Sequence, residues 1–344
     1  MADDRPLEQL WYGDATGAAA ARVALLPLSL LYRGATAMRN AAYDAGVFSS
    51  EDPALPCVSV GNLTVGGTGK TPISAWIARR LLDAGAHPAI VLRGYGDDEP
   101  LVHARLNPNV PVIVAPDRLA GVKTASTRGA DVAVLDDAFQ HRRARRVADL
   151  VLISAERWSD RPRMLPAGPW REPMAALSRA TTVIVTRKIA DAARAELVAD
   201  SVRRLQPTLP IAIAHLALDA LESADGSATR SIADLSEQRV LAIAAIADPS
   251  AFGEQLERQG ARVELHALPD HHAFSDTEIA SLAARASAAD FVVSTLKDAV
   301  KLAPRWPRAA PTLWYVSQRI FVERGGAALD AALAAVLGAR RSKS

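Results

Sequence analysis

Residues 66–71 constrain the fold of this chain more than any other segment. They read Gly-Gly-Thr-Gly-Lys-Thr, follow the apolar run 57–60, and lead into the helical pattern 71–84. In a strand–glycine loop–helix unit, backbone N–H groups turn toward phosphate oxygens and the helix N-terminus adds its positive end. The segment therefore predicts a P-loop that binds a nucleoside triphosphate.

Each residue of this loop has an expected role. Lys70 is expected to reach the β- and γ-phosphates, and the hydroxyl of Thr71 to bind Mg²⁺. The strict P-loop pattern has glycine at position 64, where this chain has Thr64. The Gly-Lys-Thr core in its strand–turn–helix context outweighs that departure. The predicted nucleotide-binding residues are Gly66, Gly67, Thr68, Gly69, Lys70 and Thr71.

Strand-like apolar runs alternate with helical patterns along most of the chain. The first runs cover 57–60, 89–92, 112–115, 132–135, 150–153 and 182–185. Such alternation predicts an α/β fold of the P-loop NTPase type, with a mostly parallel sheet, helices on both faces, and ligands at the carboxyl ends of the strands. Asp117 is expected to cap the helix that follows 112–115. The alanine-rich region 190–228 has no clear pattern.

The length of 344 residues suits more than one domain. A second α/β unit shows strand-like runs at 239–246, 291–294 and 312–316 and a final helical run near 327–337. We therefore predict an N-terminal helical segment over 1–48, a P-loop domain over 49–228 and a smaller C-terminal α/β domain over 229–344.

The apolar segment 17–32 is the candidate for contact with a membrane. It is shorter than the ~20 residues of a spanning helix, and it contains Arg22 and Pro27. Arg33 and Arg39 follow it. An apolar run with cationic flanks is typical of a helix that lies on a membrane surface. A helix that packs on the protein itself is the alternative.

Composition argues against several other classes of protein. The net charge is only +2 and aromatic residues make up 5%, so neither a strong positive field nor a stacking platform for nucleic acid is expected. The single cysteine, Cys57, cannot form an internal disulfide and suits a reducing cytosol. Asp3 and Asp4 argue against a secretory signal peptide. Nothing in the sequence indicates an obligate protein partner.

Carboxylates follow the predicted strands and are candidates for metal binding and acid–base chemistry. Asp136 and Asp137 end the run 132–135, where a P-loop protein holds Mg²⁺; a strand-end turn is the alternative. The acids of the glycine loop 93–100 could accept a hydroxyl proton or form a turn. In the segment 270–272, adjacent histidines make a poor chelate, so one histidine oriented by a carboxylate is preferred. The arginine-rich run 139–146 is either a solvated face or a contact with an anionic substrate.

The order of motifs resembles one enzyme family. The motifs are VGNLTVGGTGKTP, RGYG, DEP, LDDAFQHRR, LPAGPWREP, DHHAF and TLKDAVK. They resemble the tetraacyldisaccharide 4′-kinases of the lipid A pathway in Gram-negative bacteria, over nearly the whole chain. The resemblance implies ATP- and Mg²⁺-dependent phosphorylation of the 4′-hydroxyl of a lipid A disaccharide precursor to give lipid IVA. It also implies a peripheral enzyme at the cytoplasmic face of the inner membrane, with substrate bound between a P-loop domain and a smaller domain.

The resemblance assigns roles to individual residues. Asp98 of the DEP motif matches the family's proposed base, and His271 matches its partner. Lys70 joins them as a catalytic residue, and Thr71, Asp136 and Asp137 match the metal site. The candidate substrate-binding residues are Asn62, Arg93, Tyr95, Gln140, His141, Arg171 and Glu172.

The chain also departs from the family pattern. Ala138 replaces a glycine after the paired aspartates, and the loop before Asp98 is shortened, with Asp97 in place of a glycine. The alternative function is a P-loop GTPase or ATPase of the metallochaperone or switch type. Such GTPases carry an Asn/Thr-Lys-x-Asp motif, whereas residues 295–298 read Thr-Leu-Lys-Asp, which is the wrong order.

Overall fold

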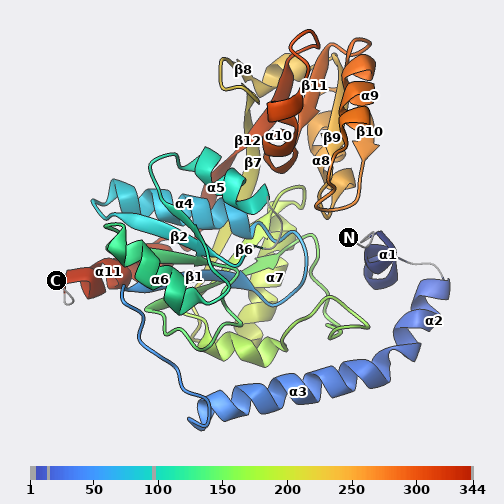
Figure 1. Ribbon diagram of the computed structural model, residues 1–344. Coiled ribbons are helices and arrows are strands. Elements are labelled where there is room, and N and C mark those ends of the chain that lie inside the picture. Colours follow the sequence, from blue (N-terminus) through green and yellow to red (C-terminus); the bar gives the residue numbers. More distant parts are fainter. Residues whose placement is uncertain (1–4, 14–15, 95–97, 342–344) are drawn as a thin grey trace. The chain divides into compact units, whose positions relative to one another are not determined.

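The computed structural model describes residues 5–13, 16–94 and 98–341, and these form two compact units (Figure 1). The larger unit comprises the described residues up to 94 together with 103–215 and 322–341. The smaller unit comprises 98–102 and 216–321. The division falls inside helix α5 (Asp98–Leu106) and inside strands β7 (Ile211–Ser223) and β12 (Leu313–Arg324).

A parallel sheet forms the centre of the larger unit, with the strand order β7-β6-β5-β1-β4-β2-β3. The central strand β1 pairs Cys57 with Ala133 of β4 and Val58 with Ala148 of β5. All six residues of β1 are buried, as expected for a strand covered on both faces. The strands are β1 (Cys57–Asn62), β2 (Pro88–Leu92), β3 (Val112–Val114), β4 (Val132–Asp136), β5 (Ala148–Ser154) and β6 (Thr182–Arg187).

Helices cover both faces of this sheet, which confirms the predicted fold class (Figure 1). On one face, Val122 of α6 packs with Cys57 and Val198 of α7 packs with Val151. Alternate strand residues point to opposite faces, so Val58 faces the other side, where α4 and α11 contact the strands. The helices are α4 (Lys70–Asp83), α6 (Arg118–Thr127), α7 (Ala192–Leu205) and α11 (Gly326–Arg341), with the 3₁₀ helix Met174–Arg179.

Local sequence signals placed many of these elements, but not all of them. Asp117 caps α6 as predicted, because its Oδ1 accepts the Leu119 N–H at 3.0 Å. The region 190–228 contains α7 and all of β7, which the pattern did not predict. Two of the four buried residues of α7, Ala195 and Ala199, are alanines. Alanine contrasts weakly with polar neighbours, so the helical period was hard to detect.

The strands of the smaller unit follow the order β10-β9-β11-β12-β7 and belong to the same continuous sheet, and β8 pairs antiparallel with β7. Phe252 of α8 packs with Val240 on one face, and Leu282 of α9 packs with Leu241 on the other. β12 extends well beyond the predicted end at 316, because the polar stretch after it remains extended. The remaining elements are β8 (Thr229–Ser231), β9 (Arg239–Ala244), β10 (Arg262–Ala267), β11 (Phe291–Ser294), α8 (Pro249–Glu257), α9 (Asp276–Ala286) and α10 (Leu296–Leu302), with the 3₁₀ helices Ile232–Leu235 and Ala303–Arg305.

Three helices lie in the described residues before β1, and all are part of the larger unit. They are α1 (Arg5–Tyr12), α2 (Thr16–Ala24) and α3 (Leu26–Asp44). Pro27 does not break a helix, because it lies in the first turn of α3, where no intrahelical N–H bond is lost. Among the described residues, the structure contains no helix with both the length and the apolar character needed to cross a bilayer.

The polar side chains of helix α3 face the rest of the larger unit, and its apolar side chains face solvent. Ser29 Oγ accepts the Ala167 N–H at 3.0 Å, and Tyr32 donates to the Arg171 carbonyl at 3.2 Å. Leu30 and Leu31 are 66% and 71% exposed. The two alternatives for this segment are therefore compatible, because its polar side chains bind the protein and its apolar face remains uncovered in the monomer.

Candidate functional site

The P-loop lies between the end of β1 and the start of α4, and its neighbours hold it on two sides. Asn62 Nδ2 donates to Thr68 Oγ1 at 2.8 Å, and Thr186 Oγ1 of β6 donates to the Thr68 carbonyl at 2.9 Å. Gly66 and Gly69 have φ angles of 101° and 86°, which favour glycine. Thr64, which departs from the strict pattern, forms a β-bridge with Trp170. These contacts fix the conformation of the loop without a bound nucleotide.

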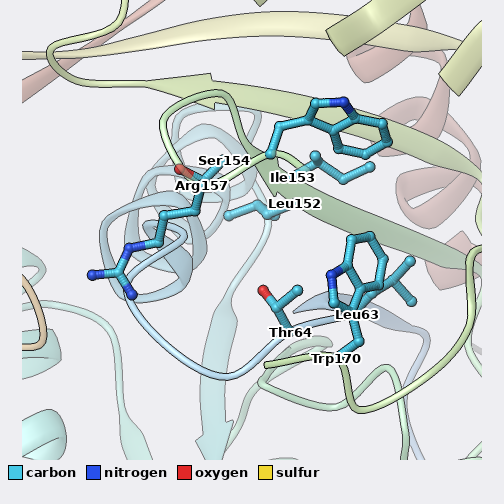
Figure 2. Close-up of a pocket in the computed structure, with 8 residues that line it drawn as sticks. Leu63, Thr64, Leu152, Ile153, Ser154, Arg157 and Trp170 are labelled. Carbon is cyan, nitrogen blue, oxygen red and sulfur yellow. The ribbon is translucent and has the colours of Figure 1, made fainter. Parts of the chain in front are cut away.

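A small pocket opens beside this loop (Figure 2). The rings of Trp158 and Trp170 meet edge to face with centroids 6.3 Å apart. A Cβ atom at Gly66 would lie only 2.6 Å from Nη1 of Arg157, the flexible end of a side chain that can move away, so it is the positive φ of Gly66 that favours glycine. The pocket is lined by Leu63, Thr64, Leu152, Ile153, Ser154, Arg157, Trp158 and Trp170.

Lys70 and Thr71 begin α4, and both are half-buried. Among the residues that the structure describes, none forms a hydrogen bond or an ion pair with the Lys70 ammonium. Its charge nevertheless acts on Asp137. Burial alone would raise the pKa of Asp137, but the positive charges of Lys70 and Arg171 outweigh burial and hold that pKa well below its usual value. No described carboxylate therefore contacts the Lys70 ammonium directly.

The paired aspartates at the end of β4 have different surroundings. Asp136 is 3% exposed; its Oδ1 accepts from Ser74 Oγ at 2.9 Å and its Oδ2 lies 2.8 Å from His103 Nε2. Asp137 has a left-handed φ of 47°, and both of its oxygens bind Arg171, at 2.7 and 3.1 Å. The turn at Asp137 therefore directs two adjacent carboxylates to separate partners.

These residues fit a magnesium ion that is bound together with a nucleotide. Ser74 lies one turn after Thr71 on α4, so its bond holds Asp136 against the turn that carries the Thr71 hydroxyl. Each carboxylate oxygen has a second lone pair for a further ligand. Within the described part of the chain, no group of three or more His, Cys, Asp or Glu residues is arranged to hold a metal. Magnesium typically needs only one or two carboxylates beside phosphates and water.

Three of the candidate substrate-binding residues meet at the end of β1. Gln140 Nε2 donates to the Asn62 carbonyl at 2.9 Å, and Arg171 contacts the Asn62 amide oxygen while it binds Asp137. Gln140 Oε1 and His141 Nε2 are buried and have no hydrogen-bond partner in the described structure. Burial and the charge of Arg118 lower the pKa of His141, which favours the neutral imidazole.

The other candidates lie in different surroundings. Glu172 is fully buried; it binds Arg179 at 2.8 Å and Asn40 of α3 at 3.0 Å. Through these contacts Glu172 helps to hold α3 in place. Arg93 is exposed at the end of β2. Tyr95 lies outside the described residues.

The smaller unit brings together two residues that are 173 positions apart in the chain, Asp98 and His271. Asp98 opens α5 with only 3% of its side chain exposed, and its Oδ1 lies 3.1 Å from His271 Nδ1. His271 has a left-handed φ of 59°, and its backbone N–H donates to Asp270 Oδ1 at 3.0 Å. The next residue, His272, binds Glu278 at 2.9 Å instead. The two histidines therefore have different partners, as the sequence indicated.

The charges around this pair favour an ionised Asp98. Burial would raise its pKa, but the hydrogen bond with His271 and the charges of Lys297 and Lys301 lower it to about 2. The hydrogen bond with Asp98 raises the pKa of His271, and this effect exceeds those of burial and of the Lys297 charge. Such a carboxylate–imidazole pair can orient an imidazole and stabilise its protonated form.

Comparison with known proteins identifies the family. The family model described as "Tetraacyldisaccharide-1-P 4'-kinase" matches residues 21–98 and 96–338. The chain belongs to this kinase family. The motif order had indicated the same family, and the match spans both of its α/β units.

Two named relatives and one solved structure agree with this assignment. A tetraacyldisaccharide 4′-kinase of Anaeromyxobacter sp. strain Fw109-5 is 38% identical, over 95% of this chain and 96% of its own length. That of Halorhodospira halophila is 36% identical, over 91% and 92%. A crystal structure described as "apo" form LpxK from Aquifex aeolicus in complex with ATP is 25% identical, with a TM-score of 0.72, and covers 92% of this chain and 99% of its own.

Several residues of this family member that contact the candidate site were not predicted. Ser74 follows Thr71 by three positions, so helical spacing from the P-loop could have indicated its contact with Asp136. His103 and the buried Arg118, which donates to the Asp136 carbonyl at 3.2 Å, have no such local signal. Lys297 and Lys301 lie within the TLKDAVK motif that carried the resemblance, but their contact with Asp98 depends on tertiary structure.

Proposed function

We propose that this chain transfers the γ-phosphate of ATP to the 4′-hydroxyl of tetraacyldisaccharide 1-phosphate and so forms lipid IVA. The observation that carries the proposal is the match with tetraacyldisaccharide 4′-kinases over more than nine-tenths of both chains. The same match outweighs the alternative of a P-loop GTPase or ATPase switch. The proposed chemistry needs a phosphate cradle, a cation at the transferring group and a group that takes the hydroxyl proton.

The P-loop supplies the first two requirements. Backbone N–H groups of the loop and the N-terminus of α4 would bind the phosphates of ATP, and the ammonium of Lys70 would stabilise the charge on the γ-phosphate. Mg²⁺, held by Thr71 and Asp136 with Asp137 beside them, would neutralise charge on the β- and γ-phosphates when bound. The short contacts of Asp136 with Ser74 and His103 support this role, because they restrict the carboxylate to one orientation.

The pair Asp98 and His271 is proposed to take the proton from the sugar hydroxyl. The hydroxyl oxygen attacks the γ-phosphorus, its proton passes to the imidazole, and the bond between the γ-phosphorus and the bridging oxygen breaks to release ADP. We had expected Asp98 to be the base. Since only 3% of its side chain is exposed, against 14% for His271, the imidazole is the better group to meet substrate. Asp98 would then orient and stabilise it.

Polar atoms without partners support a substrate-binding role for Gln140 and His141. Buried polar groups normally have hydrogen-bond partners, and a sugar or phosphate of the substrate could supply those that Gln140 Oε1 and His141 Nε2 lack among the described residues. Arg171, Asn62, Arg93 and Tyr95 remain candidates for the same role. For Glu172 we propose instead that it anchors α3.

The function can be tested with purified full-length protein, ATP labelled in the γ-phosphate and tetraacyldisaccharide 1-phosphate. We expect transfer of label to the glycolipid, no transfer to a 4′-deoxy analogue, and loss of transfer when EDTA removes Mg²⁺. GTP should replace ATP poorly. Hydrolysis of ATP or GTP without any labelled glycolipid would contradict the proposal and favour the switch alternative.

We further propose that α2 and α3 lie on the cytoplasmic face of the inner membrane, where an acylated substrate would be held. The exposed apolar side chains on this segment support the proposal: Val23, Leu26, Leu28, Leu30 and Leu31 are 41–71% exposed. Leu25, in the same apolar run, is half-buried. Arg22, inside the run, binds the carbonyls of Leu10 and Gly13, and Arg39, one of the two cations that follow the run, binds Glu172. Arg33 is exposed and fits the expectation.

Changing Leu30 and Leu31 to aspartate should weaken vesicle binding by at least about tenfold, since burial of each leucine is worth roughly 1.5–3 kcal/mol. Activity on bilayer substrate should fall more than activity on a short-chain analogue dispersed in detergent. Leu197 and Leu205 of α7 are 59% and 55% exposed and provide a matched control when changed to aspartate. Equal sedimentation of both double variants with anionic vesicles would contradict a membrane role for α3.

A further inference from the structure

The ammonium of Lys297 lies between the carboxylate of Asp270 and the imidazole of His271. Its Nζ is 2.7 Å from Asp270 Oδ1 and 3.0 Å from His271 Nε2, and it is 3.8 Å from Asp98 Oδ2. These contacts all lie within the smaller unit. The imidazole of His271 thus meets a carboxylate at Nδ1 and an ammonium at Nε2.

The hydrogen-bond chemistry of these partners leaves one consistent assignment. An ammonium group has only donors, so a hydrogen bond between Lys297 and His271 Nε2 requires that Nε2 carries no proton, although Asp270 Oδ2 also lies 3.9 Å from it. A neutral imidazole then carries its hydrogen on Nδ1, where Asp98 Oδ1 accepts it at 3.1 Å. Asp270 takes a second donor of the same ammonium. Every group in the series from Asp270 to Asp98 therefore has a defined donor or acceptor role.

We propose that Lys297 is a positioning residue that holds His271 as the neutral Nδ1–H tautomer, with an unprotonated Nε2 ready to accept the hydroxyl proton. The proposal rests on the proposed function, because it assigns Lys297 a part in preparing the base of that reaction. The substrate hydroxyl would replace the ammonium at Nε2. Lys297 would remain bound to Asp270 at that stage.

The helix that carries Lys297 is held firmly. Thr295 caps α10 by accepting the Asp298 N–H at 3.3 Å, and the buried Asp298 accepts the Ala245 N–H at 3.0 Å and the Thr295 hydroxyl at 2.7 Å. Lys301, one turn later, donates to the His272 carbonyl at 3.0 Å and lies 3.7 Å from Asp98 Oδ2. Lys301 thus approaches the carboxylate of the pair, whereas Lys297 contacts the imidazole as well.

The charges that face His271 give the direction of the expected effect. Asp98 and Asp270 favour its protonated form and Lys297 opposes it, while Lys301 and Asp298 lie beyond Asp98. Removal of the Lys297 charge should therefore raise the pKa of His271 further. If the active enzyme needs neutral His271, the acidic limb of the kcat–pH profile moves to higher pH, and activity lost near neutrality returns in alkaline solution.

The test compares Lys297→Met, Lys297→Arg and Lys301→Met in the full-length enzyme. For Lys297→Met we expect an upward shift of the acidic limb on the order of one pH unit, about tenfold lower kcat at neutral pH and an almost unchanged KM for ATP. Lys297→Arg, which keeps a donor and a charge, should restore much of the wild-type limb. Lys301→Met should leave the limb near its wild-type position. A pH-independent loss of activity in Lys297→Met would overturn the proposal.

A second measurement is independent of activity. Nitrogen chemical shifts of His271 in ¹⁵N-histidine-labelled protein, assigned with His271→Gln, report which ring nitrogen is protonated. The wild type should show Nδ1–H with an unprotonated Nε2 at neutral pH, and Lys297→Met should show a protonated or mixed state. A wild-type Nε2–H tautomer would refute the role of Lys297. Absence of phosphate transfer with the expected tautomer would instead refute the proposed function alone.

Discussion

Lys70→Ala should lower kcat by on the order of 10³-fold or more without unfolding the protein. Lys70 begins α4, and no described residue forms a hydrogen bond or an ion pair with its ammonium, so its removal breaks no internal contact of that kind. What is lost is a positive charge at the transferring phosphate, where charge spreads in the transition state. The effect should therefore appear in turnover with both substrates saturating, while the melting temperature stays near that of the wild type.

Arg79→Ala provides a control on the same helix. Arg79 forms an exposed ion pair with Asp83 at 3.0 Å, and such surface pairs contribute about 0–1 kcal/mol. This variant removes one positive charge from α4 but should keep nearly full activity. Near-normal turnover of Lys70→Ala, or an equal loss in Arg79→Ala, would exclude the P-loop mechanism.

Asp98→Ala and His271→Ala should each lower kcat by about 10²–10⁴-fold, the usual contribution of general acid–base catalysis. Both residues are proposed to act on the sugar hydroxyl, so the KM for ATP should change little. Since the two side chains are in hydrogen-bond contact at 3.1 Å, they should act as a unit. The double variant should then be little worse than the worse single variant.

His272→Ala is the matched control for this prediction. His272 is adjacent to His271 in sequence, but it binds Glu278 and packs against Phe274. Its removal should affect stability more than turnover. Multiplicative losses in the Asp98 and His271 double variant would show that the two residues act independently, and a large rise in the KM for ATP would place them on the nucleotide side.

Contiguous residues explain why the nucleotide half of the site was predictable. The conformation of the P-loop, and the phosphate binding proposed for it, depend on glycines, a lysine and a threonine within six positions, between a buried strand and a helix. The capping of α6 by Asp117 is equally local. Both features depend on backbone geometry that neighbouring residues determine, so they could be read from spacing alone.

Other parts of the site required the tertiary structure. The sequence marked 17–32 as apolar, but only the structure showed that Ser29 and Tyr32 bind the segment 167–171 while Leu30 and Leu31 stay exposed. The contact of Asp136 with His103 likewise joins the end of a strand to a separate helix. No periodicity specifies such pairs, because they depend on how separate elements pack.

The sequence by itself determined the parallel α/β fold, the P-loop and, through the order of its motifs, the family. It also suggested that Asp98 and His271 act together, but only by resemblance. The tertiary structure decided that they meet, that Asp98 is the buried member, and that Lys297 contacts the imidazole. The reason is physical: burial and the charges of Lys297 and Lys301 set the pKa of Asp98, and those charges come from residues about 200 positions away that only folding brings within 4 Å.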